Sequence, residues 1–265
     1  MEHIEQERVN ENQGSLFDVF AGDEAQNIQQ INLDSYPEFT LKEQLTLEKQ
    51  AIGYYLTASL FDEYHDIAKK LEIMPLSKFN TEDEDIQEII NARYAKLKPK
   101  VLIAGIINYM GSRPTRKGGK IAFIRIEDAS GELEFVVFND EFEKYKHLFK
   151  IDELVFVEGE VIYDSFRNEV KVNASQVFQL DEVIQNRVSS VELSFNSQHD
   201  WNKIKTILQL SVDGSSSVKL NYANSHAECS LVLGDSARFS PNYANLEQLS
   251  DIVGKTHWRL QLNRV

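Results

Sequence analysis

Histidines, cysteines and paired carboxylates are the side chains of this 265-residue chain that could do bond-making or metal chemistry. The six histidines are scattered, and none has a partner at metal-ligand spacing. Cys229 is the only cysteine, and because it lies in the apolar run CSLVLG we expect it to be a small core residue. The sequence therefore predicts no catalytic residue, no metal site and no cofactor.

Two carboxylate pairs have structural explanations. Asp83 and Asp85 belong to the acidic run TEDED, where negative charge suits the positive end of a helix. Glu127 and Asp128 stand beside a predicted hairpin turn, where aspartate commonly bonds the neighbouring backbone. Successive strand residues face opposite sides, so this pair would not converge on a pocket. A hydrolase that uses Glu127 and Asp128 is the least favoured hypothesis.

Binding is the chemistry that the sequence favours. The stretch YMGSRPTRKGGK carries four cations and no acid, and a second stretch, YDSFRN, adds two aromatic rings and an arginine. Cations follow phosphates and rings stack on bases, so such a set suits single-stranded nucleic acid. The predicted single-stranded DNA site consists of Arg113, Arg116, Lys117, Lys120, Phe123, Arg125, Tyr163, Phe166 and Arg167. The alternative is that Phe123 fills the core and the cations only keep the protein soluble.

Residues 99–180 must position these side chains, and here the apolar period is two, which is typical of strands. We predict three strands, a short helix and two more strands. This is the element order of an OB fold, a five-stranded barrel in which the two loops above rim the nucleic-acid groove. The predicted elements are, in order, KVLIAGIINYM, KIAFIRIED, ELEFVVF, the helix FEKYKHLF, ELVFVEGEVIYD and NEVKVNASQVF.

Three further segments complete the predicted α+β multidomain architecture. Residues 1–35, rich in Glu, Gln and Asn, are expected to be flexible. Residues 36–98 are expected to be helical, with a first helix from Thr40 and a second from about Thr81 to about Lys96. Residues 188–265 alternate strand and helix patterns and predict a small α+β domain, whereas residues 181–190 fit either a helix or a hinge.

The net charge of −14 does not exclude a nucleic-acid partner, because its distribution is uneven. Residues 1–98 hold 9 basic and 20 acidic residues, whereas residues 99–180 hold 11 and 13. The chain contains a single cysteine, no apolar run long enough for a bilayer and no signal-peptide pattern at its start. These features predict a cytoplasmic protein without a membrane partner.

The polar leader contains an apolar cluster, NQGSLFDVF. Within it, the residues from Gln13 to Phe17 resemble the pentapeptide by which bacterial replication proteins hold the sliding clamp. A mobile segment can present apolar side chains to a cleft on a partner. The resemblance implies that the clamp-binding residues are Gln13, Ser15, Leu16 and Phe17. The alternative is a hydrophobic staple onto the helix that begins at Thr40.

Other segments resemble the bacterial DNA polymerase III alpha subunit in the same order along the chain. They are LEKQAIGYYLTASLFDEY, KGGKIAFIRIEDASGELEFVVF and RFSPNYANLEQLSDIVGKTHWRLQL. One departure is the stretch from Ala58 to Leu60, where many members have Gly-His-Pro.

The resemblance implies the non-catalytic C-terminal region of a DNA-directed DNA polymerase, without its palm domain. It also implies three partners: the sliding clamp, single-stranded template DNA and the tau subunit of the clamp loader. Tau would bind the last domain, and the candidate residues of its docking surface are Trp258 and the terminal RLQLNRV. The alternative is a free-standing OB-fold accessory protein that binds single-stranded DNA.

Overall fold

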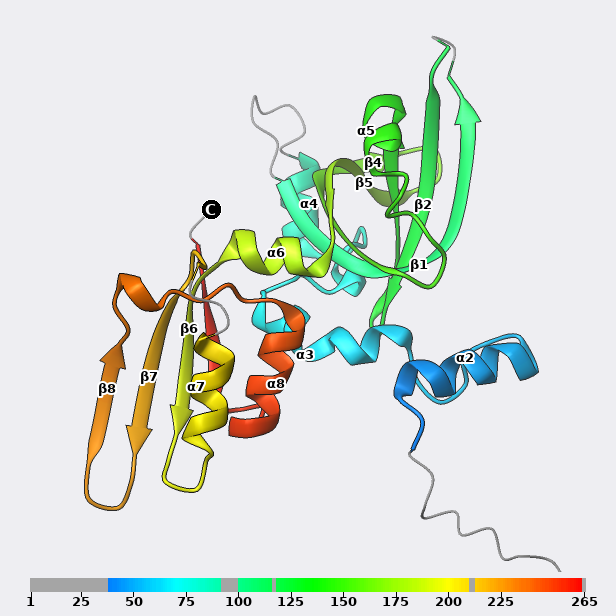
Figure 1. Ribbon diagram of the computed structural model, residues 1–265. Helices are drawn as coiled ribbons and strands as arrows, with labels where there is room; N and C mark the ends of the chain where they lie inside the picture. Colours follow the sequence, from blue (N-terminus) through cyan, green and yellow to red (C-terminus); the bar gives the residue numbers. More distant parts are fainter. Residues whose placement is uncertain (1–37, 92–99, 116–117, 210–212, 264–265) are drawn as a thin grey trace, which may run out of the picture. The chain divides into compact units, whose positions relative to one another are not determined.

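The computed structural model describes residues 38–91, 100–115, 118–209 and 213–263 (Figure 1). Residues 1–44 form one unit and residues 45–265 another. In the first unit, the N–H and hydroxyl of Thr40 both donate to the Glu43 carboxylate at 2.9 Å. The Glu43 N–H donates to the Thr40 hydroxyl oxygen at 3.3 Å. The predicted capping box is therefore confirmed, and it begins the first helix.

Short helices connected by turns make up the described residues 41–91. The first helix ends at Ile52, where Gly53 follows with a left-handed φ of +89°. Ser59 caps the next helix and forms a capping box with Asp62, so the departure from Gly-His-Pro still makes a defined turn. The helices are α2 (Leu41–Ile52), η4 (Leu60–Tyr64), α3 (His65–Lys70), η5 (Leu76–Lys78) and α4 (Glu84–Asn91).

Five strands close into a barrel in the order β1-β2-β3-β5-β4. All neighbouring pairs are antiparallel except β3 and β5, which run parallel over three paired residues. The predicted fold class, α+β with a five-stranded OB barrel, is confirmed. The elements are β1 (Lys100–Pro114), β2 (Lys120–Asp128), β3 (Gly131–Phe138), α5 (Asn139–Tyr145), β4 (Leu154–Asp164) and β5 (Glu169–Phe178).

The barrel interior is apolar because alternate residues of each strand point inward. Ile124, Phe135 and Val172, from three different strands, are fully buried in this core. Outside the barrel, the turn between β2 and β3 is fixed by Asp128, whose carboxylate accepts hydrogen bonds from Gly131 N–H at 2.8 Å and Leu76 N–H at 2.9 Å. Asp128 therefore has a structural role at the turn, as its position beside a predicted turn suggested.

A second sheet has the strand order β8-β7-β6-β9, and helices α7 and α8 lie against one of its faces (Figure 1). The stretch 181–190, which fitted either a helix or a hinge, begins with helix α6. Gly254, with φ of +89°, ends α8. The elements are α6 (Leu180–Arg187), β6 (Val188–Phe195), α7 (Trp201–Gln209), β7 (Ser217–Ala223), β8 (Glu228–Val232), η7 (Asp235–Ala237), α8 (Tyr243–Val253) and β9 (Trp258–Leu262).

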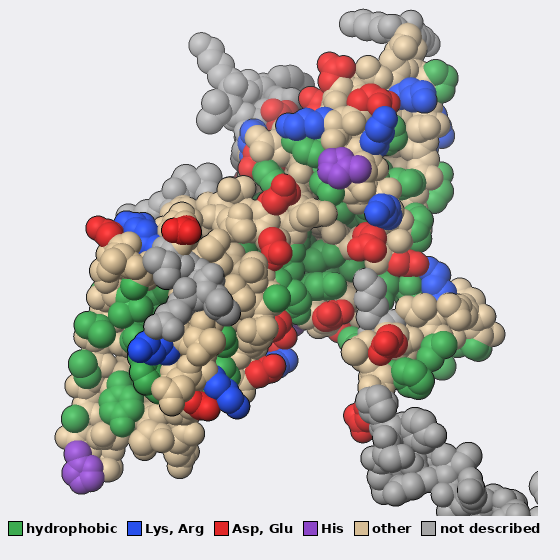
Figure 2. Space-filling model, in the orientation of Figure 1, with side chains coloured by type: hydrophobic (Ala, Val, Ile, Leu, Met, Phe, Trp, Pro, Cys, Tyr) green, Lys and Arg blue, Asp and Glu red, His purple; other side chains and the backbone are tan. Residues whose placement is uncertain are grey.

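Two expectations about this second sheet are wrong. Cys229 is exposed, as are all the residues of β8, one of the two edge strands of the sheet. Figure 2 shows apolar side chains on this part of the surface, and Leu231 and Val232 are among the exposed residues. Trp258 is only 3% exposed and lies under the Lys70 ammonium group, 4.1 Å from the ring centroid, so its ring is unsuited to a partner surface.

Candidate nucleic-acid interface

Two arginines lie over two aromatic rings on the outer face of β1 and β2. The Arg113 guanidinium carbon is 5.5 Å from the Phe123 ring centroid, and the Arg125 guanidinium carbon is 5.5 Å from the Tyr109 ring centroid. Phe123 and Arg125 alternate with buried residues, which confirms that both face the same side of β2. This cluster of Tyr109, Arg113, Phe123 and Arg125 is called the stacked face below.

Arg113 does not lie in a loop as expected. Strand β1 continues to Pro114, and Arg113 is paired opposite Ile121 of β2. The paired part of the β1–β2 hairpin is therefore longer than predicted, and the loop that connects the two strands begins only after Pro114 (Figure 1). A strand fixes the direction of a side chain better than a loop does, so Arg113 is held over Phe123 by the strand pairing itself.

A β-bulge explains why the sequence pattern did not predict that Tyr109 faces outward. The register of β1 against β2 shifts at Asn108, where β1 contains one extra residue. Ile103 and Ile107, before the bulge, point into the barrel, so uninterrupted alternation would bury Tyr109 as well. The bulge reverses the alternation, and Tyr109 stands opposite Arg125 with half of its surface exposed. The available signal was that Tyr109 is the first residue of the basic stretch YMGSRPTRKGGK.

The loop between β4 and β5 presents an aromatic ring from a well-ordered turn. The Asp164 carboxylate accepts hydrogen bonds from the backbone N–H groups of Phe166 at 3.1 Å and Arg167 at 3.3 Å. Asn168 adopts a left-handed φ of +57°, and its side-chain oxygen accepts a hydrogen bond from the Tyr163 hydroxyl at 2.6 Å. Phe166 is 94% exposed, which places a bare ring at the tip of this turn.

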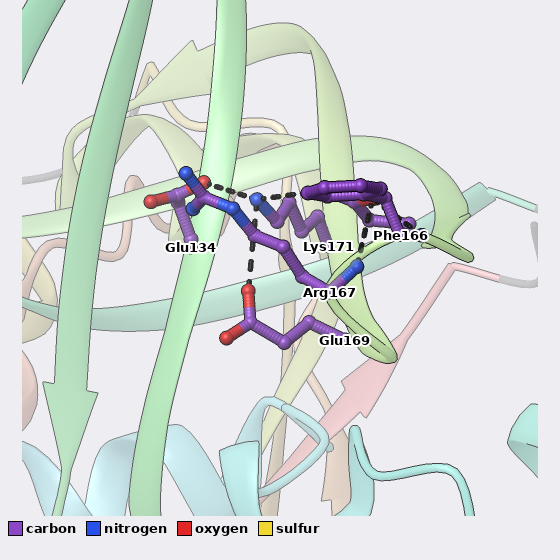
Figure 3. A network of polar contacts seen from close by, with 6 residues as sticks. Glu134, Phe166, Arg167, Glu169 and Lys171 are labelled. Atoms are coloured by element: carbon purple, nitrogen blue, oxygen red, sulfur yellow. Dashed lines mark hydrogen bonds and ion pairs between the residues drawn. The ribbon is translucent and has the colours of Figure 1, made fainter.

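Lys171 on β5 is a buried cation behind this loop (Figure 3). Its ammonium nitrogen lies 2.8 Å from a Glu134 oxygen, 3.4 Å from an Asp164 oxygen and 3.7 Å from a Glu169 oxygen. Burial alone would lower the pKa of Lys171, but the pairing with Glu134 and Asp164 raises it above its ordinary value. Lys171 is therefore a buried charged residue, for which the sequence pattern predicted only a place in a strand.

Carboxylates offset the positive charge more than the sequence suggested. Figure 2 shows acidic and basic side chains interspersed over the barrel. Arg125 lies 3.8 Å from Glu132, and a pocket of about 390 Å³ beside it has both arginines and carboxylates in its wall. The charged residues that line this pocket are Arg125, Glu132, Glu134, Arg167 and Glu169. The interface is thus a mixed-charge surface with cations stacked on rings rather than a uniformly basic groove.

The remaining predicted binding residues divide into two groups. Lys120 is exposed at the start of β2, next to the stacked face, and its N–H donates to the Asn139 side chain at 3.3 Å. Arg116 and Lys117 lie outside the described residues, and so does the predicted clamp motif of Gln13, Ser15, Leu16 and Phe17.

Within the described ranges, no group of three or more His, Cys, Asp or Glu side chains is arranged to hold a metal ion. Glu127, one of the two carboxylates that the hydrolase hypothesis would use, accepts a hydrogen bond from the Asn108 side chain at 2.8 Å. None of the described helices has the length and apolar character that crossing a membrane requires.

The barrel has a defined class: residues 101–180 match the family model described as OB-fold nucleic acid binding domain, and the strand order is that of an OB fold. The whole chain is similar to the DNA polymerase III alpha subunit. The subunit from Pseudomonas aeruginosa is 28% identical over 82% of this chain, and that from Neisseria meningitidis is 26% identical over 98%. These relatives confirm the resemblance predicted from the motifs.

The chain spans about a fifth of the length of these relatives, 18% and 21% respectively. Among solved structures, the SSB domain of a Synechococcus sp. protein aligns with 30% of this chain and 93% of its own, at 11% identity and a TM-score of 0.28.

Proposed function

We propose that this chain is a non-catalytic C-terminal part of a bacterial replicative DNA polymerase and that its barrel binds single-stranded template DNA. The similarity to DNA polymerase III alpha subunits over nearly the whole chain supports this proposal over a free-standing accessory protein. The observation that carries the DNA-binding part is the stacked face, in which two guanidinium groups lie over two rings on one side of the barrel.

The geometry suits a single strand better than a duplex. Unpaired bases can stack on Tyr109, Phe123 and the bare ring of Phe166, whereas duplex bases are already stacked on one another. The phosphates would contact Arg113, Arg125 and Lys120 along the β1–β2 hairpin, because the carboxylates of β3 repel them. The same carboxylates limit the affinity, which we expect to be modest and strongly dependent on salt.

A charge-removing pair tests the phosphate contacts. Replacing Arg113 and Arg125 together by glutamine should weaken binding of a fluorescent oligodeoxynucleotide roughly tenfold, a loss of about 1.4 kcal/mol. The slope of log affinity against log salt should become shallower by about 1.4, since each phosphate contact to a single strand contributes roughly 0.7. Fluorescence anisotropy at several salt concentrations measures both quantities.

The matched control removes the same charge from the C-terminal domain by replacing the exposed residues Lys203 and Lys205 with glutamine. This control should leave affinity and slope near the wild-type values. Equal effects of the two pairs would show that net charge, rather than the stacked face, governs binding.

Two protein partners complete the proposal. The segment from Gln13 to Phe17 would tether the chain to the sliding clamp, and the α+β domain from residue 188 would dock the tau subunit of the clamp loader. Both assignments are supported by the similarity to DNA polymerase III alpha subunits and by the order of the motifs. The chain would thus hold a polymerase on DNA by three separate contacts.

The tau assignment predicts the behaviour of a truncated chain. The full chain should retain purified tau in a pull-down, whereas a chain ending at residue 187 should lose it, because the second sheet and its helices would be absent. The truncated chain should still bind single-stranded DNA, since the barrel ends at Phe178. Retention of tau by the truncated chain would place the docking surface elsewhere.

A further inference from the structure

Lys171 occupies a position where a cation is costly to bury. Its side chain is only 6% exposed, and transfer of an ammonium group from water into a protein interior is unfavourable unless it is paired. Three carboxylates surround it, at 2.8, 3.4 and 3.7 Å (Figure 3). These carboxylates come from β3, from the end of β4 and from the start of β5, so one lysine joins three strands.

The pairing removes negative charge from the proposed DNA face. Glu134 lies in register with both Arg125 on β2 and Lys171 on β5, and its side chain is 16% exposed. Without Lys171, the carboxylates of Glu134 and Asp164 would repel each other and any approaching phosphate. The ammonium group therefore offsets part of the negative charge in the wall of the pocket, which Arg125 and Arg167 also line.

The pairing also anchors the loop that carries the bare ring. Asp164 contacts Lys171 through one carboxylate oxygen and accepts the N–H groups of Phe166 and Arg167 through the other. Partial desolvation would raise the pKa of Asp164, but the hydrogen bonds from these N–H groups and from Lys171 lower it. Asp164 thus links the buried cation to the backbone of the loop tip.

We propose that Lys171 is a positioning residue for single-stranded DNA, because it offsets part of the negative charge of Glu134 and Asp164 and fixes the β4–β5 loop so that Phe166 and Arg167 face the strand. This inference rests on the proposed function of the barrel. Lys171 itself does not touch the DNA; it acts through the loop and through the charge of the pocket wall.

Replacing Lys171 by methionine tests the inference, since methionine keeps an unbranched side chain without the charge. We expect oligodeoxynucleotide affinity to fall roughly tenfold, or about 1.4 kcal/mol. Amide hydrogen exchange at Phe166 and Arg167 should become faster, because the carboxylate that accepts their N–H groups loses its anchor. Lys171→Arg should restore most of the affinity, since arginine keeps the ion pairs.

Two controls separate the effect from charge and from folding. Lys100→Met removes an exposed lysine that is paired with Glu158 at 2.9 Å, and it should change neither affinity nor exchange at the loop. Asp164→Ala, on the exposed loop, leaves Lys171 and Glu134 paired but removes the acceptor for the loop N–H groups. It should give faster amide exchange at Phe166 and Arg167 even if Lys171→Met does not fold.

The outcomes distinguish this inference from the proposed function. If the wild-type chain does not bind the oligodeoxynucleotide, the DNA-binding function itself is wrong, and the inference falls with it. If the wild-type chain binds and Lys171→Met has unchanged affinity and loop exchange, only the role of Lys171 is overturned. With Lys171→Met unfolded, unchanged amide exchange at Phe166 and Arg167 in Asp164→Ala would overturn it in the same way.

Discussion

Replacing Leu16 and Phe17 together by alanine is expected to lower the affinity of the chain for purified sliding clamp by at least about 100-fold. Apolar anchors that fill a pocket on a partner commonly contribute 2 kcal/mol or more each, and 100-fold corresponds to about 2.7 kcal/mol. The two residues are adjacent large apolar side chains in a strongly polar leader, where a partner surface is the simplest reason for them. Surface plasmon resonance with immobilised clamp measures the loss.

The leader provides its own matched control. Val19 and Phe20 are also large and apolar but lie outside the pentapeptide, so Val19→Ala with Phe20→Ala should leave clamp affinity within a few-fold of wild type. The melting temperature should be unchanged in both double variants. If the two pairs weaken binding equally, the leader binds through general hydrophobicity and the predicted register of the motif is wrong. A fall in melting temperature for Leu16 and Phe17 alone would instead favour the hydrophobic staple.

The sequence predicted the barrel because its evidence is local. Strict alternation in KIAFIRIED and ELEFVVF, with a turn composition between them, defines a hairpin without knowledge of any distant contact. The Thr40 capping box was predictable for the same reason, since Thr40 and Glu43 are three residues apart. Helix α5 was predicted at 142–149 but lies at Asn139–Tyr145, a shift typical of element ends.

The site was less predictable because its key contacts are not local. Lys171 and Glu134 are 37 positions apart and meet only because β3 and β5 pair in parallel at the closure of the barrel. The alternation of KVLIAGIINYM gives no warning of the bulge at Asn108, which decides that Tyr109 faces outward. The prediction that Cys229 is buried was wrong for a related reason. Its apolar strand predicts burial, but whether a strand lies at a sheet edge depends on the order of all four strands.

The aromatic half of the stacked face carries the second large effect. Replacing Tyr109 and Phe123 together by alanine should weaken single-stranded DNA binding at least roughly 30-fold, because stacking on each ring contributes about 1–3 kcal/mol. Unlike the loss of the arginines, this change should leave the salt dependence of binding almost unaltered, since no phosphate contact is removed. Titration of the same oligodeoxynucleotide at several salt concentrations separates the two contributions.

Conservative variants determine whether the rings act by stacking or by supporting the barrel. Tyr109→Phe keeps the ring and should bind as the wild type does, whereas Phe123→Leu keeps apolar volume without a ring and should bind more weakly. Tyr54→Ala removes another exposed ring, 61% accessible and outside the barrel, and should have no effect on binding. Full binding by Phe123→Leu together with a lower melting temperature of the double alanine variant would assign the rings a packing role. In that case, Phe166 and the cations alone would have to account for DNA binding.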